Sequence, residues 1–281
     1  MMWALKIVGK MLFSRFHLPY GFWKWMGIFR HGRMDSLDYP IKIFTLHVNR
    51  AFPHGLPNDS VILELGPGDS IASALLGYAS GAKQIYLVDV GDFSRRDVAF
   101  YRALASDMSR KGYRVPDLGM ADSFDAILSA CNARYSTEGI SSLGTIASES
   151  VDFIWSHSVL EHIRKHELRA TLNELRRILK PKALSSHNID YQDHLDHGLN
   201  NLRFSEKVWE STLFIESGFY TNRVPAVMLH EMFTEVGFEI LQESFGKWPV
   251  LPTARRAMHK DFQIFSDAEL LNRTSHVLLR L

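Results

Sequence analysis

Short apolar runs alternate with amphipathic stretches along residues 59–190. The runs with the character of buried strands are 61–65, 84–90, 133–137, 151–158 and 183–189. The stretches with the character of helices are 70–80, much of 92–130, and 159–180, where leucine and isoleucine recur every three to five residues until Pro181. Strands that alternate with helices predict right-handed crossovers, and therefore a mainly parallel sheet with helices on both faces.

The alternation breaks at residues 191–225, which we interpret as an insertion. A helix at 225–237 follows, and then two strands at 238–244 and 276–281, separated by a segment long enough to carry a helix of its own. The pattern thus predicts an α/β fold with seven strands, in which a core (59–190) precedes a C-terminal part (191–281) that holds the insertion and the last two strands.

Residues 1–58 form a distinct N-terminal region, linked to the core through the proline- and glycine-containing stretch 52–60. Residues 1–60 contain eight Lys or Arg and three Asp or Glu. One face of a predicted helix carries six apolar residues, Ala4, Leu5, Val8, Met11, Leu12 and Phe16. Aromatic side chains follow between 22 and 29. Two compatible interpretations remain: a helical cap or lid packed on the core, and a peripheral contact with a membrane interface.

Composition narrows the class of protein further. The net charge of +1 gives no support for nucleic acid as a partner. A single cysteine, Cys131, excludes an internal disulfide and a multi-cysteine metal site, which fits a reducing cytosol. No apolar run approaches the roughly 18–20 residues that span a bilayer, and the N-terminus does not resemble a signal peptide. We therefore expect a cytoplasmic protein, and leave its oligomeric state open.

The stretch VILELGPGDS (61–70) ends a predicted strand in a turn with few side chains. Gly66 and Gly68, which flank Pro67, let a ligand approach the main chain, and the next helix presents oriented N–H groups. In an open parallel sheet, ligands bind at the carboxyl ends of the strands, where this turn lies. Asp89 ends the second strand, and a carboxylate there can accept both hydroxyls of a ribose. These features predict a nucleoside cofactor.

NAD and S-adenosylmethionine both fit this pattern, and two residues of the chain discriminate between them. The dinucleotide fingerprint requires a third glycine at position 71, which is Ile71 in this chain. Glu64 would repel a pyrophosphate, whereas it would attract an ammonium group such as the one that S-adenosylmethionine carries. The residues therefore favour S-adenosylmethionine over NAD.

The stretches ELGPGDS, YLVDV, VDFIWSHSVLEHI and LRRILKPKA resemble, in order and spacing, the motifs of class I S-adenosylmethionine-dependent methyltransferases. The resemblance covers roughly residues 59–190 and implies a Rossmann-like fold. It implies that Glu64 and the glycine turn hold the methionine end of the cofactor, that Asp89 holds the ribose, and that Ser156 and His157 lie beside it. No clear aspartate for the adenine amino group follows 133–137, so Glu138 is the candidate.

A methyl acceptor with a hydroxyl group needs a base, and we look for it in residues 185–205. This stretch is expected to follow the fifth strand as a loop that faces the acceptor, and it is rich in His and Asp. We interpret His194, oriented by Asp190 and with His187 nearby, as the base. The alternatives are a metal site, and polar side chains that only face solvent or cap the loop; no metal is assigned. His162, after the fourth strand, is interpreted as structural.

The segment 187–223 also resembles bacterial methyltransferases linked to surface-polysaccharide assembly. This resemblance implies O-methylation of a sugar or glycan. The residues that would suit a glycan, through aromatic faces and polar groups, are Arg203, Trp209, Tyr220, Asn222 and Arg223. The alternatives are packing of these side chains against the core, a small-metabolite or nitrogen acceptor, and a methyltransferase-like module that binds without catalysis.

Overall fold

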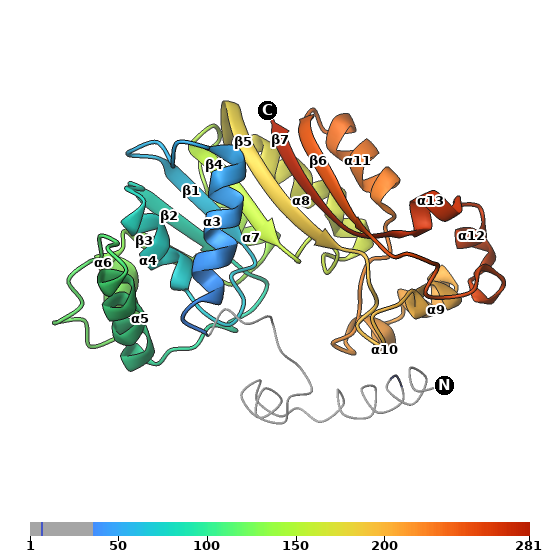
Figure 1. The fold of residues 1–281 in the computed structure, drawn as a ribbon, viewed down its shortest axis with the longest axis horizontal. Helices are drawn as coiled ribbons and strands as arrows, with labels where there is room; N and C mark the ends of the chain where they lie inside the picture. The colour runs from blue at the N-terminus through green and yellow to red at the C-terminus, as the bar shows by residue number, and fades with distance from the viewer. Residues whose placement is uncertain (1–6, 8–35) are drawn as a thin grey trace.

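The structure is a computed structural model and describes Ile7 and residues 36–281 (Figure 1). Its sheet has seven strands in the order β3-β2-β1-β4-β5-β7-β6. The strands are β1 (Val61–Leu65), β2 (Gln84–Val88), β3 (Ala133–Ser136), β4 (Val151–His157), β5 (Leu179–Asp190), β6 (Glu239–Lys247) and β7 (Asn272–Arg280). Strands β1 to β5 pair in parallel, whereas β7 is antiparallel to both β5 and β6. The predicted seven-stranded, mainly parallel sheet is confirmed.

Four helices cover one face of the sheet: α3 (Tyr39–Ala51), α4 (Ala72–Ala79), α5 (Val98–Arg110) and α6 (Phe124–Ala130) (Figure 1). Their apolar sides pack on alternate strand residues such as Ile62, Phe153 and Trp155. Side chains of Asp97 and Ser123 accept hydrogen bonds from the first turns of α5 and α6 and fix where these helices begin. This face therefore carries the N-terminal helix α3 as well as the crossover helices.

Three helices cover the opposite face: α7 (Ile140–Gly144), α8 (Lys165–Ile178) and α11 (Ala226–Glu235). In α8, Leu168, Leu172 and Leu175 are fully buried, as the leucine spacing predicts. Helices on both faces of one sheet give the three-layered α/β architecture expected from the alternation of elements.

The insertion and the segment between β6 and β7 carry short helices at one end of the sheet (Figure 1). These are η1 (Asn200–Arg203), α9 (Glu206–Trp209), α10 (Thr212–Ile215), η2 (Arg255–Ala257), α12 (Lys260–Gln263) and α13 (Asp267–Leu270). Leu199 and Leu202 of the insertion share an apolar cluster with Met258, Phe262 and Leu270. The two segments therefore pack together beyond the carboxyl ends of the parallel strands.

The predicted helix at 159–180 is shorter than expected, because residues 159–164 form turns and α8 begins only at Lys165. The side-chain amide of Asn222 donates to the carbonyls of Leu160 (2.7 Å) and Ile163 (3.0 Å), and its backbone N–H donates to that of Glu161 (2.7 Å). These carbonyls are held by the insertion instead of by helical N–H groups, so contacts from a distant segment override the helical pattern.

Pro181 does end the helical pattern, but it lies inside β5 and not in a turn after the helix. Helix α8 stops at Ile178 and the chain enters β5 directly at Leu179, whose backbone is extended. The pairing of β4 with β5 shifts register between Val151 and Phe153, opposite the proline, where a regular ladder hydrogen bond cannot form.

Most of the predicted N-terminal cap lies outside the described residues, including the apolar helical face at 4–16, Ile7 excepted, and the aromatic residues at 22–29. Its described C-terminal part is α3. Among the described residues, no helix combines the length and the apolar character that crossing a membrane requires.

Candidate active site

The carboxyl ends of β1, β2 and β4 bring the predicted cofactor residues to one edge of the sheet. Leu65 pairs with Val88 on one side and with Ser156 on the other, so the glycine turn lies between Asp89 and His157. The parallel register of β1 with β2 and β4 is therefore sufficient to bring the glycine turn, Asp89 and His157 to the same edge.

Both glycines of the turn adopt left-handed backbone conformations, with φ of +75° at Gly66 and +64° at Gly68. A Cβ on Gly66 would lie 2.3 Å from Cγ2 of Val159 in the turn after β4. Position 66 therefore needs a glycine because its backbone is left-handed and because Val159 packs closely against it. These two reasons hold whether or not a ligand approaches the turn.

The Asp89 carboxylate is anchored beside the turn. Its Oδ2 accepts a hydrogen bond from Gly68 N–H (3.0 Å), and its Oδ1 accepts one from Val90 N–H (2.7 Å). Burial raises the pKa of Asp89 to about 6, and these backbone donors oppose that rise. Each oxygen retains a lone pair, so the carboxylate can accept further hydrogen bonds from a ribose.

Glu64 is buried on β1, with 3% of its surface exposed. Its Oε2 has no hydrogen-bond partner among the described residues, and burial raises the pKa of the carboxyl well above its usual value. A buried carboxyl with an unpaired oxygen next to a glycine turn suits a cationic ligand group, because the cation would offset the cost of ionising it. Glu64, Gly66, Pro67, Gly68 and Asp89 thus fit the methionine and ribose parts of S-adenosylmethionine.

The other three predicted cofactor residues lie close by but differ in what their side chains contact. Glu138 follows β3 with an exposed side chain, while its N–H donates to Ser142 Oγ (3.0 Å). The Ser156 hydroxyl is fully buried and bonds to Nδ1 of His187 (2.7 Å) on the neighbouring strand β5. Of the three, only Glu138 has a side chain that solvent or a ligand reaches freely.

His157 belongs to a buried histidine cluster that the sequence pattern did not reveal. His157 Nδ1 lies 3.2 Å from Nε2 of His47 on α3, and Nδ1 of His47 is 2.9 Å from Ser186 Oγ. Ser186 Oγ is also 3.2 Å from Nε2 of His276 on β7. Burial lowers the pKa of both His157 and His276 to about 4, so these rings are neutral near pH 7 and fasten α3 to the sheet.

The stretch predicted to form a loop after the fifth strand begins inside that strand. His187 and Asp190 both lie in β5, which pairs with β7 as far as Asp190 and Thr274. Both ring nitrogens of His187 are bonded to serines, Nδ1 to Ser156 and Nε2 to Ser185 (2.6 Å), and burial lowers its pKa to about 3. A ring so enclosed is poorly placed to act as a base.

His194 is exposed in the loop after β5, and its ring centre lies 4.8 Å from that of His162. His162 Nδ1 donates to the carbonyl of Tyr220 (3.0 Å), which leaves its Nε2 unprotonated. The Asp190 carboxylate accepts two hydrogen bonds from Gln192 and also acts electrostatically on His162. The structure therefore brings His162, His194 and Asp190 together.

The described residues include no group of three His, Cys, Asp or Glu side chains arranged to hold a metal ion. Asp193, the buried acid of the stretch, instead accepts hydrogen bonds from the N–H groups of Leu195, Asp196 and Asn200 and shapes the loop.

Two of the predicted substrate residues have a different role. Trp209 is fully buried and donates from Nε1 to the carbonyl of Thr221 (2.7 Å), and Tyr220 is 6% exposed and donates to Glu210 (3.0 Å). Both rings belong to the apolar cluster of the insertion with Phe214. Their faces are covered, which corrects the prediction that they offer stacking surfaces to a sugar.

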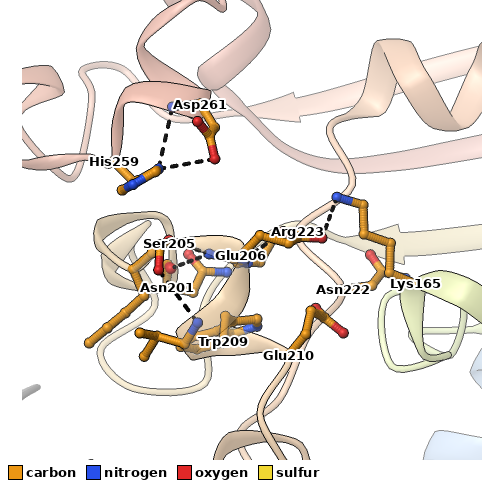
Figure 2. Close-up of polar contacts among 12 residues, drawn as sticks. Lys165, Asn201, Ser205, Glu206, Trp209, Glu210, Asn222, Arg223, His259 and Asp261 are labelled. Carbon is orange, nitrogen blue, oxygen red and sulfur yellow. Dashed lines mark hydrogen bonds and ion pairs between the residues drawn. The ribbon is translucent and has the colours of Figure 1, made fainter.

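The polar members of the predicted set hold the insertion together (Figure 2). The fully buried guanidinium of Arg223 donates to the carbonyls of Asn201 (3.2 Å) and Phe204 (2.7 Å) and pairs with Glu206 (2.8 Å). Arg203 donates from Nε to Asn200 Oδ1 (3.0 Å). Asn222, as described above, connects the insertion to the turn after β4.

A family model described as a methyltransferase domain matches residues 42–243. An S-adenosylmethionine-dependent methyltransferase from Methanosarcina mazei is 16% identical, with 81% of this chain and 95% of that chain covered and a TM-score of 0.49. One from Mesorhizobium loti is 13% identical, with 88% and 100% covered and a TM-score of 0.46.

Phosphoethanolamine N-methyltransferase 2 from Haemonchus contortus, solved with S-adenosylmethionine, is 14% identical, with 85% of this chain and 52% of that chain covered and a TM-score of 0.45. At such identities the structural likeness concerns the fold alone. The search of the curated proteins found no match.

Proposed function

Because the chain belongs to the methyltransferase-domain family, we propose that this S-adenosylmethionine-dependent methyltransferase methylates a hydroxyl group of a sugar or glycan. The observation that carries the choice of a hydroxyl is the grouping of His162, His194 and Asp190 at the ends of β4 and β5, on the same edge as the glycine turn. A hydroxyl acceptor needs such a base, since its proton must leave as the new bond forms.

S-adenosylmethionine, when bound, supplies a methyl group that its sulfonium already activates. The chain's own residues have three tasks. Glu64 holds the ammonium group and Asp89 the ribose hydroxyls, which fixes the cofactor against the glycine turn. His194 takes the proton of the acceptor hydroxyl, with His162 beside it, and holding the acceptor in line is worth about 7–11 kcal/mol of the barrier.

The acceptor class is tested with matched pairs of compounds. We expect methyl glycosides to be methylated on oxygen, as measured by transfer of a labelled methyl group, and their amino-sugar counterparts not to be methylated on nitrogen. Transfer to nitrogen alone would contradict the proposal. If S-adenosylhomocysteine raises the melting temperature but no acceptor in the panel reacts, the binding-module alternative gains support.

Cofactor affinity should fall in mild acid because Asp89 must be ionised to accept the ribose hydroxyls. With its pKa raised to about 6, protonation of Asp89 should by itself make the dissociation constant of S-adenosylhomocysteine about tenfold larger at pH 5 than at pH 7. Titration calorimetry across this range measures the effect. Glu64 adds a dependence of the same sign, so the comparison is with Asp89→Asn, which should bind more weakly and show a flatter pH profile. Identical profiles would refute the role of Asp89.

A further inference from the structure

A cavity of about 40 Å³ lies where the turn after β4, the end of β5, the insertion and the start of β7 meet. Glu161, Asn201, Arg223 and Asn272 are among its lining residues. Each of them has a buried polar atom without a hydrogen-bond partner among the described residues: Glu161 Oε2, Asn201 Oδ1, Arg223 Nε and Asn272 Oδ1. Four such atoms are thus gathered around one small space.

This gathering is unusual for a folded interior. A buried polar atom without a hydrogen bond destabilises the folded protein, and proteins leave few of them. The Glu161 carboxyl is 4% exposed, and its Oε1 already accepts a hydrogen bond from Asp190 N–H (3.2 Å). Its Oε2 therefore remains available to the cavity. The volume admits roughly one to three water molecules, or a ligand group of that size.

The lining atoms combine hydrogen-bond donors with acceptors. Arg223 Nε can only donate, whereas Asn201 Oδ1 and Asn272 Oδ1 can only accept. Burial raises the pKa of Glu161 well above its usual value, which favours the protonated carboxyl, and in that form it can donate as well. A hydroxyl group both donates and accepts, and it matches this mixture better than a group that does only one.

The charges around the cavity disfavour an anion. Glu206 already neutralises the Arg223 guanidinium through a contact of 2.8 Å. The two side chains lie next to each other in Figure 2. Asp190 and Glu269 also border the cavity and add negative charge. An anionic ligand group would meet these carboxylates without a free cation on the lining to offset them.

The cavity also lies close to the cofactor turn. Glu161 is two residues after Val159, which packs on Gly66. Asp190 is the last residue of β5, and the loop that contains His194 follows it. We propose that this cavity binds a neutral hydroxyl or hydroxymethyl group of the acceptor, with Glu161, Asn201 and Asn272 as the residues that select it. The inference rests on the proposed function and narrows its substrate to uncharged, hydroxylated groups.

The test uses three probes on one three-carbon skeleton: glycerol, glycerate and 2-amino-1,3-propanediol. Amide chemical shifts of the ¹⁵N-labelled full chain, without cofactor, are followed during titration. We expect glycerol to shift the amides of residues 201, 223 and 272 with a dissociation constant at least tenfold lower than that of glycerate. Glu161→Gln should keep these shifts because it still donates, and Glu161→Met should lose them.

The matched control is Glu231→Met, which replaces an exposed acid on α11 and should leave the glycerol titration unchanged. Asn272→Leu provides a second test if Glu161→Met fails to fold, and it too should lose the shifts. Glycerate or the amine binding as well as glycerol, or shifts that persist in both variants, would overturn the proposal. Because these titrations need no cofactor, they are independent of the methyl-transfer assay, which alone tests the proposed function.

Discussion

Replacing Glu64 by glutamine is expected to weaken the binding of S-adenosylhomocysteine by at least about 100-fold. Removing one partner of a buried ion pair costs about 3–5 kcal/mol, because the other charge stays buried without compensation. The Glu64 carboxyl has no partner for Oε2 among the described residues, and its raised pKa favours the neutral form until a cation binds. Titration calorimetry with a binding isotherm for each protein measures the loss.

The same experiment reports the protonation state of Glu64. If the ammonium group ionises this carboxyl, the wild-type protein releases close to one proton on binding at pH 7, and the apparent enthalpy differs between phosphate and Tris buffers. Glu64→Gln should lose this buffer dependence. Glu231→Gln, on the exposed side of α11, is the control for a simple loss of negative charge. Unchanged affinity in Glu64→Gln would remove Glu64 from the cofactor site.

Replacing His194 by alanine should lower the turnover number on a hydroxyl acceptor by about 10²–10⁴-fold, the usual contribution of a placed base. The dissociation constant of S-adenosylhomocysteine should stay within about twofold of wild type, because the proposed role of His194 concerns the acceptor. Steady-state rates at saturating acceptor, with calorimetry alongside, separate the two quantities. The loss should shrink at high pH, where solvent takes the proton more readily.

His54→Ala is a matched control for His194→Ala, since His54 is exposed in the linker before β1. It should retain the turnover of the wild-type protein. Full activity in His194→Ala would move the base to another group, and His162, whose ring centre is 4.8 Å away, would then be the residue to replace.

Local pattern was sufficient for most of the sheet and for the glycine turn after β1. The parallel strands β1 to β4, the buried leucines of α8 and the residues Glu64, Gly66, Gly68 and Asp89 lie where the sequence predicts them, whereas β5 begins four residues before the predicted strand at 183–189. The reason is physical: apolar periodicity selects the element, and parallel pairing then brings the ends of the strands to one edge. No long-range information is needed to place a turn that directly follows a strand.

The acceptor side was predicted less well, because it is built from contacts between distant segments. Asn222 holds the carbonyls of Leu160 and Ile163 and converts a helical pattern into turns. The aromatic side chains of Trp209 and Tyr220 were predicted to stack on a sugar, but they are buried in the apolar core of the insertion. A polar or aromatic residue type does not by itself determine whether its side chain faces a ligand or another helix.

By itself, then, the sequence determined the α/β fold, the strand-to-helix turn and the acids that flank it, since neighbouring residues suffice to form these. The tertiary structure alone decided which polar atoms remain without partners. Glu161, Asn201 and Asn272 are far apart along the chain and line one cavity because the insertion folds back over the ends of β4 and β5. Burial without a partner is a property of the packed chain, and no local pattern encodes it.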